Sequence, residues 1–353
     1  MSAKQEVILS GIRPTGRLHY GNYFGAVQHF LRLQDAPATC YYFIADYHAL
    51  TTIAGRRDIR AQTIDMLRTY IACGLDPARS IVYRQSDLPC TAELALLLGM
   101  ITNIGHLERG TTYKDKFIKL KEDPKSEGNP LSYGLLGYPV LMAADILIVK
   151  ADLVPVGDDQ RQHVEMACDI AEKFNSRFGA EVLHIPRAVD RSALRLPGLD
   201  GSQKMGKSDN NTLDLLDDAA TVLKKMKGVP TTTDPAPLDT DSTDPDVVIP
   251  KMPAGVGVLY RLLSLVAPQE VYLDYIRQYR DGGKFYGTLK KSLAEYCTAF
   301  NAPIIEKFND PQYSDDFIED FLRENAKRVT PVALDTVESC REAMGIGRSL
   351  YRG

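Results

Sequence analysis

Several features that would place a protein in a common class are missing from these 353 residues. The six cysteines include no Cys-x-x-Cys pair, which argues against a zinc site and a disulfide framework and favours the reducing cytoplasm. No signal peptide and no apolar run of about 18 residues is visible, so a membrane protein is not expected. The net charge of −4 provides no overall basic surface, so any RNA would need local lysine patches. Tryptophan is absent, although 18 tyrosines are present.

The first thirty residues contain a strand, a turn and a helix around which the rest of the chain is arranged. Val7–Leu9 is an apolar run typical of a buried parallel strand, and apolar residues at helical spacing follow from 24 to 31. The turn is glycine-rich but matches neither G-x-G-x-x-G nor the P-loop. In its signature, His19-Tyr20-Gly21-Asn22, His19 could donate to phosphate, Gly21 leaves room for a base and Asn22 offers a neutral donor. Alternatively, His19 is a surface histidine and Asn22 only a helix cap.

A second signature lies in a loop rich in glycine and serine. It reads Lys204-Met205-Gly206-Lys207-Ser208, and its two lysines could swing onto a polyphosphate as charge develops. A solvated basic loop is the alternative. An H-x-G-N motif near the start followed by K-M-x-K-S much later resembles the class I aminoacyl-tRNA synthetases.

Strands and helices alternate between these motifs, which indicates a parallel sheet with right-handed crossovers. The expected strands are Thr39–Ala45 and Ser80–Arg84, and the expected helices are Arg56–Cys73 and Thr91–Ile101. Ligands gather at the carboxyl ends of such strands. Asp46 and His48 follow one of these ends, although His48 could equally be a capping or packing residue. The polar segment 110–132 is expected to be a loop over the site, with Lys114 and Lys116 able to reach a triphosphate.

An apolar helix is expected over Leu135–Val149, interrupted by one charge, Asp145. A carboxylate there is costly unless it is paired or functional. Tyr138, Met142 and Asp145 share one helix face, which suggests a ring-sized slot for an aromatic ligand with one donor. Indole and phenol both fit that description. The alternative is a partly exposed carboxylate at the helix edge.

The strand Leu153–Val156 leads into Gly157-Asp158-Asp159-Gln160 at the start of a further helix. The two carboxylates could simply be favoured by the helix dipole. They also follow a strand end, where a ribose would present hydroxyls, and Gln160 could donate or accept there.

Four runs together resemble the tryptophanyl-tRNA synthetases of bacterial type, over nearly the whole chain: SGIRPTGRLHYGNYFGA, LMAADIL, VPVGDDQRQH and KMGKS. The resemblance implies that Asp145 receives the indole N–H, that Tyr138, Met142 and Gln160 line the amino-acid pocket, and that His48 lies near it. It implies ATP binding by Arg13, Pro14, Thr15, Gly21, Asn22, Gly157, Asp158, Asp159 and the main chain near Arg195, with Lys204, Met205, Gly206, Lys207 and Ser208 around the phosphates. The implied catalytic residues are His19, Asn22, Lys116, Lys204 and Lys207, and no protein metal ligand is implied.

The resemblance also implies the architecture and the partners. It implies an α/β fold, a Rossmann-like parallel sheet with helices on both faces, plus a smaller all-helical domain. Residues 1–200 would form the catalytic domain, and 201–353 would hold the KMSKS-type loop and a helical anticodon-binding region. The last helices of this region could pack on the catalytic domain. The implied activity joins L-tryptophan to tRNA(Trp) with ATP and Mg²⁺, in a cytoplasmic homodimer. Three departures indicate a divergent member, because Arg13 replaces Gln, His19 replaces the Thr of many bacterial members and Gly206 replaces Ser.

The C-terminal part is expected to be mostly helical. The expected helices are Leu213–Lys227, Gly257–Val266, Gln269–Arg280, Tyr286–Phe308 and Asp315–Met344, with a loop at Thr231–Pro253. Read without the resemblance, these helices could be a dimerisation module, and the apolar surface at Leu94–Ile101 also suits a homodimer. Two alternative functions stay open. One is a tyrosyl-tRNA synthetase, and the other is a catalytically weak regulatory or tRNA-binding paralogue, against which the retained lysines and the GDDQ run argue.

Overall fold

The computed structural model describes residues 5–14, 16–52, 58–110, 113–114, 118, 132–190, 194–232, 237–283 and 285–347. Thr15 and Lys116 of the expected site lie outside these residues, as do most of the segment 110–132 and the side chains of Asp158, Asp159 and Ser208. No helix in the described part of the chain is long and apolar enough to cross a membrane.

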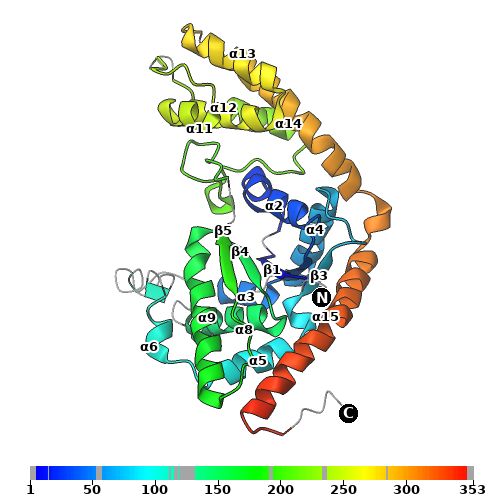
Figure 1. Cartoon of the computed structure of the whole chain (residues 1–353). Helices are drawn as coiled ribbons and strands as arrows, with labels where there is room; N and C mark the ends of the chain where they lie inside the picture. Colours follow the sequence, from blue (N-terminus) through cyan, green and yellow to red (C-terminus); the bar gives the residue numbers. More distant parts are fainter. Residues whose placement is uncertain are drawn as a thin grey trace.

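A five-stranded parallel sheet forms the centre of the N-terminal part of the chain (Figure 1), in the order β3-β2-β1-β4-β5. Its strands are β1 (Val7–Ile12), β2 (Thr39–Ile44), β3 (Ile81–Arg84), β4 (Leu153–Val156) and β5 (Arg187–Asp190). The four expected strands are confirmed, whereas β5 was not expected. The chain runs outward from β1 in both directions, so a crevice opens between β1 and β4 at the carboxyl ends of the strands.

Helices cover both faces of the sheet because its strands alternate apolar residues between the two sides. Tyr42 and Ile44 belong to a buried cluster with α2 (Gln28–Leu33) and α4 (Ile59–Ala72). Phe43 and Ala45 belong to the opposite cluster. That second cluster includes residues of α5 (Cys90–Gly99), α8 (Tyr133–Ile148), α9 (Asp158–Phe178) and α15 (Asp315–Ala343). The Rossmann-like α/β fold class is thus confirmed.

Short helical segments connect the main elements. They are α1 (Tyr20–Asn22), the π-helical η1 (Tyr23–Val27), α3 (Asp46–Ala49), η2 (Leu50–Thr52), η3 (Gln85–Asp87), α6 (Ile104–Leu107), η4 (Lys207–Asp209), η5 (Ile249–Lys251) and η6 (Pro311–Tyr313). The segments α1, η1 and α2 follow one another without a break, so the expected helix after the first turn is present.

The later helices are α10 (Ala219–Gly228), α11 (Pro245–Val248), α12 (Ala254–Val266), α13 (Gln269–Arg280) and α14 (Tyr286–Phe308). Two expectations were wrong in part. The residues 213–218 are not helical, because Asp214 bridges to His19 and the Asp218 side chain caps α10 by accepting from the Thr221 N–H. The expected loop 231–253 also contains the short α11.

Helix α15 runs along the side of the sheet region, whereas α12 and α13 lie at the far end of the molecule (Figure 1). The hydroxyl of Thr336 on α15 donates to the main-chain oxygen of Ile148 at the end of α8, over 2.9 Å. Lys150 pairs with Asp335 over 2.7 Å, and Arg341 pairs with Glu93 of α5. The last helix of the chain therefore packs directly on the layer that contains Asp145.

Candidate active site

A cavity of about 360 Å³ lies in the crevice between β1 and β4. Its wall is mainly apolar, and its few polar groups include His48, Tyr138 and Gln160. The lining residues are Leu9, Ser10, Gly11, Arg13, Phe43, Ala45, His48, Thr51, Leu135, Tyr138, Met142, Ile146, Val154, Pro155, Val156, Gly157 and Gln160. An apolar cavity of this size with a few convergent polar groups is typical of a small-molecule site.

Asp145 is only 2% exposed and lies behind this wall. Its Oδ2 is 2.9 Å from Nε2 of His48, and the Gln85 amide donates to both of its oxygens over 2.8 and 3.0 Å. Burial raises the pKa of Asp145, and the bonds from His48 and Gln85 oppose this effect. His48, rather than Asp145, is therefore part of the cavity surface.

Tyr138, Met142 and Gln160 line the cavity, as expected from the helix face that the first two share. The Tyr138 hydroxyl lies 2.6 Å from Nε2 of His163, which is 1% exposed. Neither His163 nor Gln85 was singled out from the sequence. Gln85 directly follows β3, so the strand-end rule that identified His48 would have found it too.

His19 and Asn22 cap one another at the start of α1. The Asn22 N–H donates to Nδ1 of His19 over 3.3 Å, and the Asn22 side-chain oxygen accepts from the His19 N–H over 3.1 Å. Burial, assisted by the charge of Lys207, lowers the pKa of His19 to about 4. The ring is therefore neutral at pH 7, with Nδ1 as acceptor, so its proton is on Nε2. His19 is 8% exposed and is itself the N-cap of α1, with Asn22 completing the capping box, so the alternatives of a surface histidine and of Asn22 as the cap residue are wrong. Donation to phosphate stays a prediction.

The KMGKS segment lies against the HYGN segment. Met205 is buried, and a Cβ at Gly21 would lie 3.4 Å from the Met205 Cβ and only 2.9 Å from the His19 ring. Gly16 adopts φ +77°, and a Cβ there would lie 3.6 Å from the Lys207 ammonium. Partial burial lowers the pKa of that ammonium. The structure thus brings His19, Gly21 and Lys207 together.

Asn211, which is 3% exposed, holds the KMGKS loop in shape. Its side-chain oxygen accepts from the Gly206 N–H over 2.7 Å, and its amide nitrogen donates to Ser202 over 2.8 Å and to the Lys204 main-chain oxygen over 3.2 Å. Lys204 itself is exposed. The backbone of the loop is therefore fixed while this lysine faces solvent.

The remaining expected residues border the crevice in different ways. Arg13 donates to the His48 main-chain oxygen over 3.3 Å, and Pro14 is buried. Gly157 precedes α9 and lines the cavity with its main chain. Arg195 is exposed, and the adjoining Leu194 main-chain oxygen lies 3.2 Å from the place of a Cβ on Gly25. The main chain near Arg195 therefore approaches the helical segment that follows the HYGN motif.

Comparison with known proteins places this geometry in a family. Residues 1–295 match the family model of the class I tRNA synthetases for W and Y. The chain is 41% identical to a tryptophan–tRNA ligase of Porphyromonas gingivalis, over 96% of this chain and 99% of the relative. It is 39% identical to that of Fusobacterium nucleatum, over 97% and 99%. The crystal structure of a tryptophanyl-tRNA synthetase from Campylobacter jejuni complexed with ADP and tryptophan superposes with a TM-score of 0.81, at 31% identity, over 96% of this chain and all of that one.

Proposed function

The chain belongs to the class I tRNA synthetases for tryptophan and tyrosine, and on that premise we propose how it activates L-tryptophan with ATP and transfers it to tRNA(Trp). One observation carries the assignment of the amino-acid site. A buried carboxylate, Asp145, contacts His48 on the surface of a mainly apolar cavity. A carboxylate has about four acceptor positions, and His48 and Gln85 account for three contacts. We propose that the fourth position takes the donor-only indole N–H, which requires the wall beside His48 to open, because Asp145 itself lies behind that wall.

The amino acid lies with its ring in the cavity, among Tyr138, Met142 and the residues of β1 and β4. Gln160, at the first turn of α9, faces the polar end of tryptophan. ATP lies over the HYGN segment, with Gly21 leaving space for the nucleotide and Gly157, Asp158 and Asp159 near its ribose. Arg13, Pro14 and Thr15 border the nucleotide on the β1 side, and the main chain near Arg195 meets the adenine.

In the first step, a carboxylate oxygen of tryptophan attacks the α-phosphorus of ATP. The bond to the bridging oxygen breaks, pyrophosphate leaves, and tryptophanyl-adenylate forms. His19, Lys204 and Lys207, together with Lys116 and the main chain around Ser208, stabilise the charge that develops on the phosphates. In the second step, a terminal ribose hydroxyl of tRNA attacks the acyl carbon, and AMP leaves.

Mg²⁺ would be held here mainly by the phosphates of ATP, whose charge it would partly neutralise. In the part of the chain that the structure describes, no three His, Cys, Asp or Glu side chains lie close enough to hold a metal ion. Mg²⁺ commonly keeps most of its ligands on substrate phosphates and water. The lysines and the neutral His19 fit that arrangement, because they contact phosphate without competing for the ion.

The second part of the chain is assigned to tRNA. We place the catalytic domain at 1–200 and the KMGKS loop with the anticodon-binding helices at 201–353. The helices α11, α12 and α13 form the end of the molecule away from the sheet, and α14 runs from that end back toward the sheet region (Figure 1). We propose that the anticodon binds at this far end while the acceptor end reaches the cavity. We expect this reaction in the cytoplasm, where the six free cysteines stay reduced.

We also propose a homodimer, which accounts for a group of exposed apolar side chains. The expectation of an apolar surface at Leu94–Ile101 was wrong in part, because Leu94, Leu97, Leu98 and Ile101 are buried. Leu96, Met100, Ile104 and Tyr133 are 58%, 66%, 63% and 84% exposed, and they come from α5, α6 and α8 or the turns beside them. Such a surface is costly in a monomer. Light scattering at micromolar concentration should return twice the chain mass of 39.2 kDa. A single chain mass would contradict the dimer.

The activity is tested by pyrophosphate exchange with a panel of amino acids. Tryptophan should support exchange between pyrophosphate and ATP, and tyrosine should not. Exchange with tyrosine alone would transfer the assignment to the tyrosyl branch. Absence of exchange with either amino acid would favour a non-catalytic paralogue.

A further inference from the structure

The turn after β3 contacts α3 and α8 on the side of the amino-acid site and α15 on its other side. Ser86 donates its N–H to Oδ1 of Asp46 over 3.1 Å. Gln85, which is 1% exposed, donates to both Asp145 oxygens and accepts from the His48 N–H over 3.4 Å. Gln85 therefore touches Asp145, the proposed acceptor of the indole N–H, and His48 beside it, and together with His48 it orients the carboxylate.

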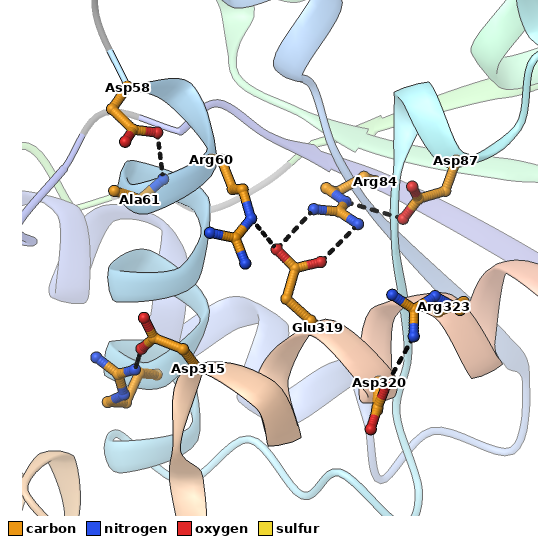
Figure 2. A network of polar contacts seen from close by, with 10 residues as sticks. Asp58, Arg60, Ala61, Arg84, Asp87, Asp315, Glu319, Asp320 and Arg323 are labelled. Atoms are coloured by element: carbon orange, nitrogen blue, oxygen red, sulfur yellow. Dashed lines mark hydrogen bonds and ion pairs between the residues drawn. The ribbon is translucent and has the colours of Figure 1, made fainter.

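The position of Gln85 depends on its neighbour Arg84. Arg84 has an extended backbone, with φ −81° and ψ 140°, and its side chain points toward the last helix rather than the cavity. Its Nη1 and Nη2 contact the two oxygens of Glu319 on α15 over 3.2 and 2.8 Å, and its Nε donates to Asp87 over 2.9 Å. Figure 2 shows these contacts together with Arg60 of α4, whose Nε lies 2.7 Å from Glu319.

This ion pair is suited to fixing a backbone. Glu319 is 8% exposed, so solvent competes little for its oxygens. A bidentate pair between arginine and a carboxylate restrains both distance and orientation. Removing the Glu319 charge leaves Arg84 paired with Asp87 over 2.9 Å but without the bidentate contact that directs its side chain toward α15. The turn 84–87 is thus held from one side by α15 and from the other by Asp46 and Asp145.

We propose that Glu319 is a positioning residue for tryptophan recognition, which acts through Arg84 and Gln85 on the Asp145 carboxylate. This inference rests on the proposed function of the site. It assigns to the C-terminal helix a direct effect on amino-acid binding, although no residue of α15 lines the cavity. A purely structural bond between α15 and β3 is the alternative, and it would affect stability and both substrates alike.

The first experiment compares neighbouring residues of one helix. Asp320 is exposed, and within the described part of the chain its ion pair is with Arg323 along the helix surface, over 2.7 Å (Figure 2). Asp320→Asn is therefore the matched control for Glu319→Gln. The emission of bound indole reports tryptophan affinity directly, because the chain contains no tryptophan. Glu319→Gln should weaken tryptophan binding by about three- to tenfold. The KM for ATP in the exchange assay should stay within about twofold of the parent, and Asp320→Asn should match the parent in both.

A second experiment tests the route through Gln85. In a Gln85→Ala background, Glu319→Gln should cause no further loss of tryptophan affinity, because the connection is already broken. Arg84→Lys keeps the positive charge but cannot make the bidentate contact with Glu319. It should show the same loss of tryptophan affinity and replaces Glu319→Gln if that variant does not fold. Unchanged affinity in Glu319→Gln, an equal loss in both backgrounds, or equal losses for tryptophan and ATP would overturn the proposal. A parent protein that does not bind tryptophan at all would instead overturn the proposed function.

Discussion

The hydroxyl of Tyr20 donates to the side-chain oxygen of Asn301 over 2.9 Å, inside the contact between the HYGN segment and α14. Asn301 is fully buried, and its amide nitrogen donates to the main-chain oxygens of Asp214 and Asp217 over 3.2 and 3.1 Å. One asparagine therefore joins the N-terminal signature, the chain that follows the KMGKS loop, and a helix of the C-terminal part.

Replacing Asn301 by Leu should lower stability strongly. It leaves the main-chain oxygens of Asp214 and Asp217 without this donor, whereas the Tyr20 hydroxyl keeps the Cys297 main-chain oxygen as an acceptor. Each unsatisfied buried group costs about 1–3 kcal/mol. Urea unfolding should therefore show a midpoint well below that of the parent. Asn309→Leu, at the exposed end of the same helix, is the control and should change the midpoint little. Equal midpoints for the two variants would mean that Asn301 is not a central contact.

The contact between Tyr20 and Asn301 shows what a sequence cannot reveal. The strands β1–β4 were predictable because each is a short apolar run, and α13 and α14 were predictable from their helical spacing. The edge strand β5 has two charged ends and no fully buried residue, so it carries no such signal. Nothing local predicts that Tyr20 meets a residue 281 positions away.

The residues of the site were likewise predictable only in part. Family motifs and strand ends identified His19, His48, Asp145 and the KMGKS loop. Gln85 was not singled out, although it also follows a strand end; what the sequence does not show is its contact with Asp145 across 60 positions. The neutral state of His19 was also beyond the sequence, because it depends on burial and on the nearby charge of Lys207. Contacts between distant segments and the solvent exposure of single atoms are properties of the folded chain only.

The neutral state of His19 leads to a prediction about pH. Its pKa of about 4 in the folded protein lies below the usual value of 6.5. The folded state therefore binds fewer protons between these pH values, so this group stabilises the fold above pH 6.5 and loses that contribution as pH falls toward 4. NMR should show no titration of the His19 ring near pH 6.5. In Lys207→Ala, the titration should move upward, because one cause of the depression is removed. A His19 midpoint near 6.5 in the parent would contradict the buried, neutral ring.

A third prediction separates chemistry from binding at Lys207. If its ammonium stabilises charge in the transition state, Lys207→Ala should lower kcat for pyrophosphate exchange by about a hundredfold or more. Tryptophan affinity should change little, because the lysine lies at the phosphate end of the site. Lys224→Ala, on the exposed face of α10, is the matched control and should exchange at the parent rate. Parent-like exchange by Lys207→Ala would remove the KMGKS loop from the mechanism.

The last prediction concerns the choice of amino acid. Because the chain contains no tryptophan, added tryptophan is the only indole in solution, and its emission should shift to the blue and saturate as it enters the apolar cavity. Asp145→Ala leaves the indole N–H without an acceptor and should weaken binding roughly tenfold to a hundredfold, equivalent to about 1–3 kcal/mol. Asp169→Ala, on the exposed side of α9, should bind like the parent.

The pH dependence of the same signal tests the state of the acceptor. Burial raises the pKa of Asp145, so protonation occurs at a higher pH than for an ordinary carboxyl group. Tryptophan binding should therefore weaken as pH falls through this raised pKa, and the decline should be lost in Asp145→Ala. Tyrosine should not displace tryptophan from the parent, since its hydroxyl projects from one ring and does not reach the same acceptor as the indole N–H. Ready displacement by tyrosine, or parent-like binding by Asp145→Ala, would contradict Asp145 as the group that selects tryptophan.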